Sequence, residues 1–360
     1  MLTPQFNDSI NWLSKLTFAR FKNLFLITTS YYFSLWSKKP LVWGQPVSVS
    51  IEPTTSCNLR CPECPSGLRA FTRPTGMLDV ELFKNTVNQI ATTASYLLLY
   101  FQGEPYLHPE FTQLINYASN KGLYTATSTN AHYLTDENAK KTIESGLDRL
   151  VISIDGTTQK TYESYRVGGK LTKVIEGTKN IIKWKKQLNS TTPYIVFQFL
   201  VVKPNEHQID EVKALGKEVG VDKVAFKTAQ LYDYKHGNEL MPSIEKYSRY
   251  KKTESTKHSP GISKAPDELG QPEKLEYELK ANLKNQCWKM WHSTVVTWDG
   301  SIVPCCFDKD AEHTQGSLKD TKLEKIWEGD SYNSFRSQLL TKRKSINICQ
   351  NCTEGTKVWG

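Results

Sequence analysis

The sequence predicts an α/β fold: a partial (β/α)6 parallel barrel followed by a small cysteine-rich domain. Between Val47 and Lys227, short runs of strand-forming residues alternate with longer helical stretches, the pattern of a parallel sheet covered by helices. Several runs are continuously apolar, as in Leu97-Leu98-Leu99-Tyr100, which favours strands buried on both faces. Residues 287–360 again contain both tryptophan and cysteine, which indicates the second domain.

Six strands and five helices are predicted in the barrel. The expected strands are Val47–Glu52, Tyr96–Phe101, Leu123–Ser128, Arg149–Ile154, Tyr194–Val202 and Asp222–Lys227. The expected helices are Asp79–Ala94, Pro109–Asn120, Asp136–Glu144, Leu171–Gln187 and Glu206–Val219. Gly122, Gly146 and Gly220 stand where helices commonly end in a left-handed residue. Active sites of barrel-like α/β folds lie at the carboxyl ends of the strands, so functional residues are expected there.

The chain of 360 residues is long enough for one large domain with a smaller appendage. The expected organisation is an N-terminal helical extension over 1–46, the barrel over 47–232, a connector over 233–286 and the auxiliary domain over 287–360. The connector is rich in Lys, Glu, Ser, Pro and Gly, with few apolar clusters. This composition predicts a mobile or loosely folded segment.

The net charge of +9 is spread along the chain with both signs interspersed, which favours an ordinary basic enzyme over a specific nucleic-acid binder. The longest purely apolar run near the N-terminus, Leu24–Ile27, is too short for a signal peptide or a membrane span. A cytoplasmic location is therefore expected. Thiols stay reduced there, so the eight cysteines are interpreted as metal ligands or catalytic groups rather than disulfides.

Residues 10–37 combine many aromatic and aliphatic side chains with interspersed lysine and arginine. The segment is predicted to form one or two helices. Packing on the main domain is the favoured interpretation. The alternative, which stays open, is an amphipathic segment that makes peripheral contact with a membrane surface.

Cys57, Cys61 and Cys64 directly follow the first predicted strand, so they lie on the expected catalytic face. Three thiolates in a short loop can hold three irons of a 4Fe–4S cubane and leave the fourth without a protein ligand. An open metal position distinguishes a site that does chemistry from one that only fixes structure. Zinc is the alternative, but no fourth Cys or His lies nearby in the sequence to close a tetrahedron.

The Cys-x3-Cys-x2-Cys spacing after a first strand resembles the radical S-adenosylmethionine superfamily. The resemblance implies a 4Fe–4S cluster whose open iron binds S-adenosylmethionine, and reductive cleavage of that cofactor to a 5′-deoxyadenosyl radical. It also implies an electron donor of the flavodoxin or ferredoxin type. One position departs from the family pattern. Glu63 stands where the family usually places an aromatic residue, which puts the adenine contact in doubt.

Gly103 and Glu104 follow the second strand in Gln102-Gly103-Glu104-Pro105. This resembles the family's Gly-Gly-Glu-Pro motif, with Gln102 in the first glycine position. The resemblance implies that these residues bind the methionyl ammonium group, for which a carboxylate is the natural partner.

Asn130 and Ser153 stand at the ends of the third and fourth strands, where small polar groups can bind ribose hydroxyls or the amino-acid carboxylate. Ordinary turn chemistry explains Asn130, Asp155 and Gly156 equally well. The resemblance implies that Ser153 and Arg166 contact the carboxylate of S-adenosylmethionine. Asp155 could instead face the substrate.

The C-terminal cysteines form a second set. Cys287 precedes Gly300 by a twelve-residue spacer and Cys305 follows it by a four-residue spacer, before Cys349-x2-Cys352. This resembles the auxiliary-cluster domain called SPASM, in its shortened "twitch" version, which implies one auxiliary 4Fe–4S cluster closed by four cysteines. Cys306 is the spare thiol, and three roles stay open for it: a bystander, an alternative ligand or a reactive thiol. A structural zinc ribbon is the alternative.

The expected function is that of a radical enzyme acting on a peptide or protein side chain, or on a sugar-like alcohol. The auxiliary cluster would take part in electron transfer. The short N-terminal extension weighs against a peptide-binding domain of the kind that peptide-maturing members carry. A non-catalytic iron–sulfur or zinc protein, acting as a redox sensor or adaptor, is the competing hypothesis.

Overall fold

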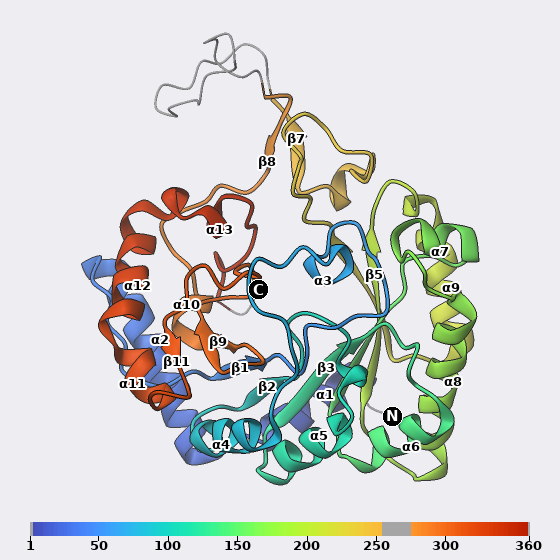
Figure 1. Ribbon diagram of the computed structural model, residues 1–360, viewed down its shortest axis with the longest axis horizontal. Helices are drawn as coiled ribbons and strands as arrows, with labels where there is room; N and C mark the ends of the chain where they lie inside the picture. The colour runs from blue at the N-terminus through green and yellow to red at the C-terminus, as the bar shows by residue number, and fades with distance from the viewer. Residues whose placement is uncertain (1–2, 254–274, 359–360) are drawn as a thin grey trace.

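The fold is a mostly parallel sheet wrapped by helices, as predicted (Figure 1). The computed structural model describes residues 3–253 and 275–358. Strands β1 to β6 lie side by side in chain order, and each pairs in parallel with the next. Their bounds are β1 Ser48–Ile51, β2 Tyr96–Leu98, β3 Tyr124–Thr129, β4 Arg149–Ser153, β5 Tyr194–Val201 and β6 Lys223–Thr228.

The helices between these strands agree closely with the sequence prediction. Two of them have the predicted bounds, and the fifth begins with a short 3-10 turn. The bounds are α4 Val80–Ile90, α5 Phe111–Asn120, α6 Asp136–Glu144, α7 Gln159–Tyr165, α8 Leu171–Gln187, η2 Glu206–Gln208 and α9 Ile209–Val219. Side chains cap several helices; Asp79, for example, accepts a hydrogen bond from the Leu82 amide at 2.9 Å, which satisfies a helix-terminal donor.

The C-terminal part of the chain extends the same sheet. Strand β9, Ser293–Val296, pairs in parallel with β1, and β10, Ser301–Val303, and β11, Gly316–Ser317, follow as antiparallel neighbours. The free edge of β1 is thereby covered, which removes an unpaired row of backbone groups. The helices of this part are α10 Lys289–His292, α11 Leu323–Glu328, α12 Asp330–Lys342, η4 Arg343–Ser345 and α13 Asn347–Gln350.

The predicted connector contains secondary structure. A short 3-10 turn, η3 Glu245–Tyr247, precedes β7, Tyr250–Lys252, which pairs antiparallel with β8, Tyr277–Leu279. This pair projects from the body of the molecule (Figure 1). The sequence predicts mobility for the whole connector, 233–286, of which residues 254–274 lie outside the described residues.

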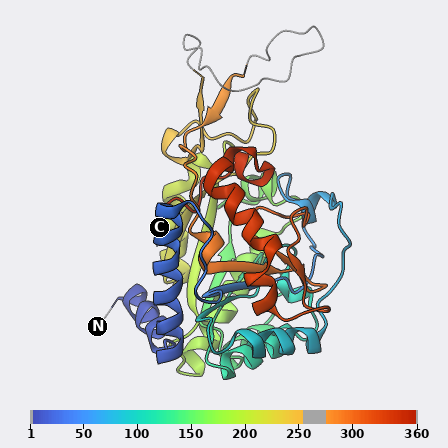
Figure 2. The same ribbon diagram turned by 90° about the vertical axis from the view of Figure 1, so that its left-hand side faces the viewer.

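Two helices precede the barrel, α1 Pro4–Ser14 and α2 Phe18–Ser37. They lie along one side of the molecule (Figure 2). Tyr31 of α2 packs edge-on against Trp288 and Trp291, with ring centroids 5.1 and 5.3 Å away. In the described parts of the chain, no helix combines the length and the hydrophobicity needed to cross a membrane.

Candidate active site

The cysteine loop leaves the carboxyl end of β1 and continues into α3, Pro65–Leu68. Cys61 is buried, and Cys57 and Cys64 are partly exposed. Burial, together with Glu104 and the two neighbouring thiols, raises the pKa of the Cys57 thiol to about 12. A thiol with so high a pKa stays protonated on its own, whereas a bound cationic iron core favours the thiolate. The three side chains therefore fit a cluster.

No three His, Cys, Asp or Glu side chains within residues 3–253 and 275–358 converge in the manner of a site for one metal ion. A cubane does not need such convergence, because each of its cysteine ligands binds a different iron.

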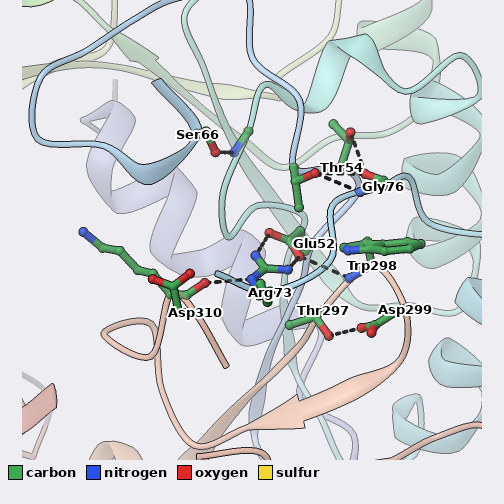
Figure 3. Close-up of polar contacts among 12 residues, drawn as sticks. Glu52, Thr54, Ser66, Arg73, Gly76, Thr297, Trp298, Asp299 and Asp310 are labelled. Atoms are coloured by element: carbon green, nitrogen blue, oxygen red, sulfur yellow. Dashed lines mark hydrogen bonds and ion pairs between the residues drawn. The ribbon is translucent and has the colours of Figure 1, made fainter. Parts of the chain in front are cut away.

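The turn after β2 docks directly onto the cysteine loop. Gly103 has a φ of +74°, and a Cβ on it would lie 2.3 Å from the carbonyl oxygen of Thr54, so only glycine fits. The Gly103 amide donates to Ser66 Oγ at 2.9 Å (Figure 3). The Glu104 amide donates to the carbonyl oxygen of Ser56 at 2.8 Å. These contacts place the Glu104 side chain beside the cysteines.

The Glu104 carboxyl is buried and held by three donors. Oε1 accepts from Thr129 Oγ1 at 2.6 Å and from the Tyr106 amide at 3.3 Å. Oε2 accepts from the Asn130 amide at 2.7 Å. Burial nevertheless raises the pKa of Glu104 to about 7, because the cost of desolvating the charge exceeds the gain from these bonds. A cationic ligand would offset that cost.

Asn130 and Arg166 approach the cysteine loop from two other elements. Asn130 Nδ2 donates to Asn58 Oδ1 at 2.8 Å and lies 4.0 Å from Cys57 Sγ. Arg166, which ends α7, places Nη1 3.7 Å from Cys61 Sγ. The structure thus gathers residues from the ends of β2, β3 and α7 around one loop.

Asp155 and Ser153 lie at the end of β4. Asp155 accepts a hydrogen bond from Arg166 Nε and another from the Leu200 amide, the latter at 2.7 Å. It is fully buried, and its ion pair with Arg166 orients the guanidinium. Ser153 is the last residue of β4, is buried, and lies opposite Gln198 of β5.

A buried ion pair at the tip of β1 was missed by the sequence analysis. Arg73 Nη1 and Nη2 donate to the two carboxylate oxygens of Glu52 at 2.9 and 2.6 Å. Arg73 Nε donates to the carbonyl oxygen of Lys309, and the Trp298 amide donates to Glu52 at 3.2 Å (Figure 3). We call these four residues the clasp. It joins β1, the segment after the cysteine loop and the C-terminal hairpin.

The second cysteine set surrounds a buried arginine. Cys287, Cys349 and Cys352 are buried, Cys305 is partly exposed and Cys306 is exposed. Arg343 Nη2 donates to Cys352 Sγ at 3.5 Å. Its Nε is buried without a hydrogen-bond partner among the described residues, an unusual cost for a charged group. A thiolate or sulfide of a bound cluster would satisfy this donor, so the residues present fit an iron–sulfur cluster.

Two family profiles match this chain. The profile of the radical S-adenosylmethionine superfamily matches residues 51–207. The profile of SPASM, an iron–sulfur cluster-binding domain, matches residues 287–353. Together the two matches cover more than half of the chain.

Two relatives match this chain over most of its length. A tungsten-containing aldehyde ferredoxin oxidoreductase cofactor-modifying protein of Pyrococcus furiosus is 24% identical over 323 residues, which cover 84% of this chain and 86% of the relative. The PqqA peptide cyclase of Gluconobacter oxydans is 24% identical over 328 residues, which cover 88% of this chain and 85% of the relative.

Solved structures share the fold. Streptococcus suis SuiB bound to S-adenosylmethionine matches with a TM-score of 0.60 at 14% identity, over 87% of this chain and 73% of that one. BtrN in complex with S-adenosylmethionine matches with a TM-score of 0.51 at 17% identity, over 86% of this chain and 93% of that one.

A parallel α/β sheet with a cysteine loop at its carboxyl edge, and a second cysteine-rich unit attached to that sheet, define an iron–sulfur enzyme. This chain belongs to the radical S-adenosylmethionine superfamily and carries a SPASM domain. Its cofactors are accordingly a 4Fe–4S cluster with S-adenosylmethionine, together with auxiliary iron–sulfur clusters in the SPASM domain.

Proposed function

We propose that this enzyme cleaves S-adenosylmethionine reductively, and that the resulting radical abstracts hydrogen from a peptide or protein side chain or from a sugar-like alcohol. The observation that carries the proposal is the buried carboxyl of Glu104, held beside Cys57, Cys61 and Cys64 by the Gly103 turn. When bound, the cluster supplies one electron that breaks the C5′–S bond of the sulfonium.

In this proposal the chain's own residues bind and orient the cofactor. Glu104 accepts the methionyl ammonium, which favours the ionised carboxylate. Arg166 has donors beyond the Nε that binds Asp155, and these hold the methionyl carboxylate. Ser153 and Asn130 complete the polar wall at the ends of β4 and β3.

Residues 287–360 hold one auxiliary 4Fe–4S cluster in this proposal, through Cys287, Cys305, Cys349 and Cys352. Four ligands leave no open iron, which favours electron transfer over substrate binding. Such a cluster would accept the electron that the substrate radical loses on oxidation, and the proton would go to solvent. Cys306 is not a ligand.

The electron for cofactor cleavage comes from a flavodoxin or ferredoxin, and the enzyme works in the cytoplasm.

The name of the PqqA peptide cyclase supports a peptide substrate. The sugar-like alcohol remains the second class, and a comparison of substrates separates the two. Formation of 5′-deoxyadenosine is measured with peptide fractions and with polyol fractions of a cell extract. The fraction that contains the substrate should raise the rate of 5′-deoxyadenosine formation above the rate measured without substrate.

Anaerobic reconstitution followed by dithionite and S-adenosylmethionine tests the proposal. We expect iron and sulfide for two cubanes and release of 5′-deoxyadenosine. The triple variant Cys57→Ala, Cys61→Ala, Cys64→Ala should release none, whereas Cys306→Ala, the matched control, should behave as wild type. Iron for one cubane or less, or no 5′-deoxyadenosine from the wild type, would support the redox sensor or adaptor instead.

A further inference from the structure

Helix α2 carries its apolar residues on the outside. The residues that it buries are mostly polar: Arg20, Asn23, Ile27, Ser30, Tyr31 and Ser34. Its exposed large residues lie on the opposite side of the helix from the buried ones, along one stripe that we call the aromatic face: Phe18, Phe21, Phe25, Tyr32, Phe33 and Trp36. A helix on the surface of a water-soluble protein normally shows the reverse arrangement.

Large apolar side chains are concentrated on this side of the molecule. Ten of the sixteen that are exposed in the described residues belong to residues 6–43, although these are a small part of the chain. Phe18 and Trp36, near the two ends of α2, are 84% and 82% exposed. The stripe follows a helix of 20 residues, roughly 30 Å long. So large a continuous apolar surface marks a site of interaction.

Buried hydrogen bonds hold α2 in the orientation that exposes the aromatic face to solvent. The Arg20 guanidinium donates to the carbonyl oxygens of Ala91 and Gly122, and Asn23 Nδ2 donates to those of Gln45 and Thr93. Turning the helix to bury its aromatic rings would leave these buried polar groups unpaired, which is costly. The face is therefore a permanent feature and must be covered from outside.

The charged residues around the aromatic face indicate what kind of partner covers it. No Asp or Glu occurs between Asp8 and Glu52, and Asp8 is buried. Lys22, Lys38 and Lys39 are exposed on or beside α2. A second copy of the same face would bring these lysines together with no acidic residue to pair with, which disfavours a homodimer. Anionic lipid headgroups supply the missing negative charge, and aromatic rings suit the boundary between headgroups and acyl chains.

We propose that the aromatic face binds the surface of an anionic phospholipid membrane, with α1 and α2 lying in its plane (Figure 2). Phe6, Ile10 and Leu13, which are exposed at helical spacing on α1, extend the contact. The enzyme rests on the bilayer without crossing it.

Vesicle flotation of the reconstituted enzyme tests this. Vesicles of phosphatidylcholine with phosphatidylglycerol should bind about tenfold or more protein than phosphatidylcholine alone, and added salt should weaken the binding. Combining Phe18→Ser, Phe21→Ser, Phe25→Ser and Trp36→Ser should abolish flotation, with iron content unchanged. The matched control, Leu188→Ser with Ile244→Ser, removes exposed apolar residues of other faces and should float as wild type.

A second variant tests the charge independently of the aromatic rings. Lys22→Glu, Lys38→Glu and Lys39→Glu combined should lose the preference for anionic vesicles, and this variant decides the matter if the aromatic one does not fold. Equal flotation of wild type and charge variant on anionic vesicles would overturn the proposal. A wild-type dimer that the serine substitutions convert to a monomer would overturn it in favour of a second copy.

Discussion

Removing either Arg73 or Glu52, the ion pair of the clasp, should destabilise the protein strongly. The two variants should differ in how the lost free energy of unfolding depends on pH. The side chains of Arg73 and Glu52 are 6% and 0% exposed. Burial raises the pKa of Glu52 although Arg73 acts to lower it. Desolvation therefore outweighs attraction within the pair, so the pair itself adds little stability while either charge left alone is costly.

Glu52→Leu leaves a guanidinium that cannot lose its proton; it should cost about 3–5 kcal/mol at neutral pH, and it leaves no carboxyl at this site to titrate. Arg73→Met leaves a carboxyl that can take up a proton. Its folded pKa then lies further above the unfolded value, so stability is fully present below the unfolded pKa and is lost as pH rises through the folded pKa, at about 1.4 kcal/mol per pH unit. The double variant should lie within about 1 kcal/mol of wild type.

Urea unfolding followed by tryptophan fluorescence measures these values, and Trp298, whose indole donates to the carbonyl oxygen of Pro74 at 3.2 Å, reports locally. Lys84→Met is the matched control, because it removes one partner of an exposed pair with Glu81 and should change the free energy of unfolding very little. Single-variant costs equal to that control, or the same pH slope for both single variants, would refute the reasoning.

Three further outcomes are expected. Glu104→Gln should weaken S-adenosylmethionine binding by about 10–100-fold in calorimetry, since a charge-assisted hydrogen bond is lost. Because burial raises the pKa of Glu104 to about 7, wild-type binding should tighten from pH 6 to 8, and the variant should lack this slope. Cys349→Ala with Cys352→Ala should spare 5′-deoxyadenosine release but abolish substrate product; equal loss of both would contradict an electron-transfer role. Arg343→Gln should lower the auxiliary-cluster potential by on the order of 100 mV in an EPR redox titration, and an unchanged potential would place the guanidinium away from the cluster.

Local periodicity made most of the barrel predictable. The helices Asp136–Glu144 and Leu171–Gln187 have the predicted bounds, because their periodic patterns lie within the segments themselves. The second strand ends at Leu98 instead of Phe101, since the chain turns there to bring Glu104 onto the cysteine loop. The pairing of β9 with β1 joins residues far apart in sequence, and no local pattern encodes it.

The site divides in the same way. The cysteines and Glu104 belong to short motifs whose spacing shows in the sequence. The clasp does not, because Glu52 and Arg73 are ordinary residue types at separate places in the chain. For Asp155 the sequence left more than one role open, and its ion pair with Arg166 could not be read from local spacing.

Glu63, the departure from the family pattern, has a structural explanation. Its carboxylate accepts hydrogen bonds from the Tyr232 amide at 2.9 Å and from Asn238 Nδ2 at 3.4 Å, so it ties the cysteine loop to the segment after β6. Lys309 Nζ in turn donates to the Tyr232 hydroxyl at 2.9 Å, and the carbonyl oxygen of the same lysine accepts from Arg73. Lys309 is thus connected to the cysteine loop by two routes. Its carbonyl oxygen binds Arg73 of the clasp, and its Nζ binds Tyr232, which in turn binds Glu63. An aromatic residue at position 63 could not accept these bonds. The glutamate therefore ties the cysteine loop to the segment after β6, and Tyr232 links that segment to Lys309 of the auxiliary domain.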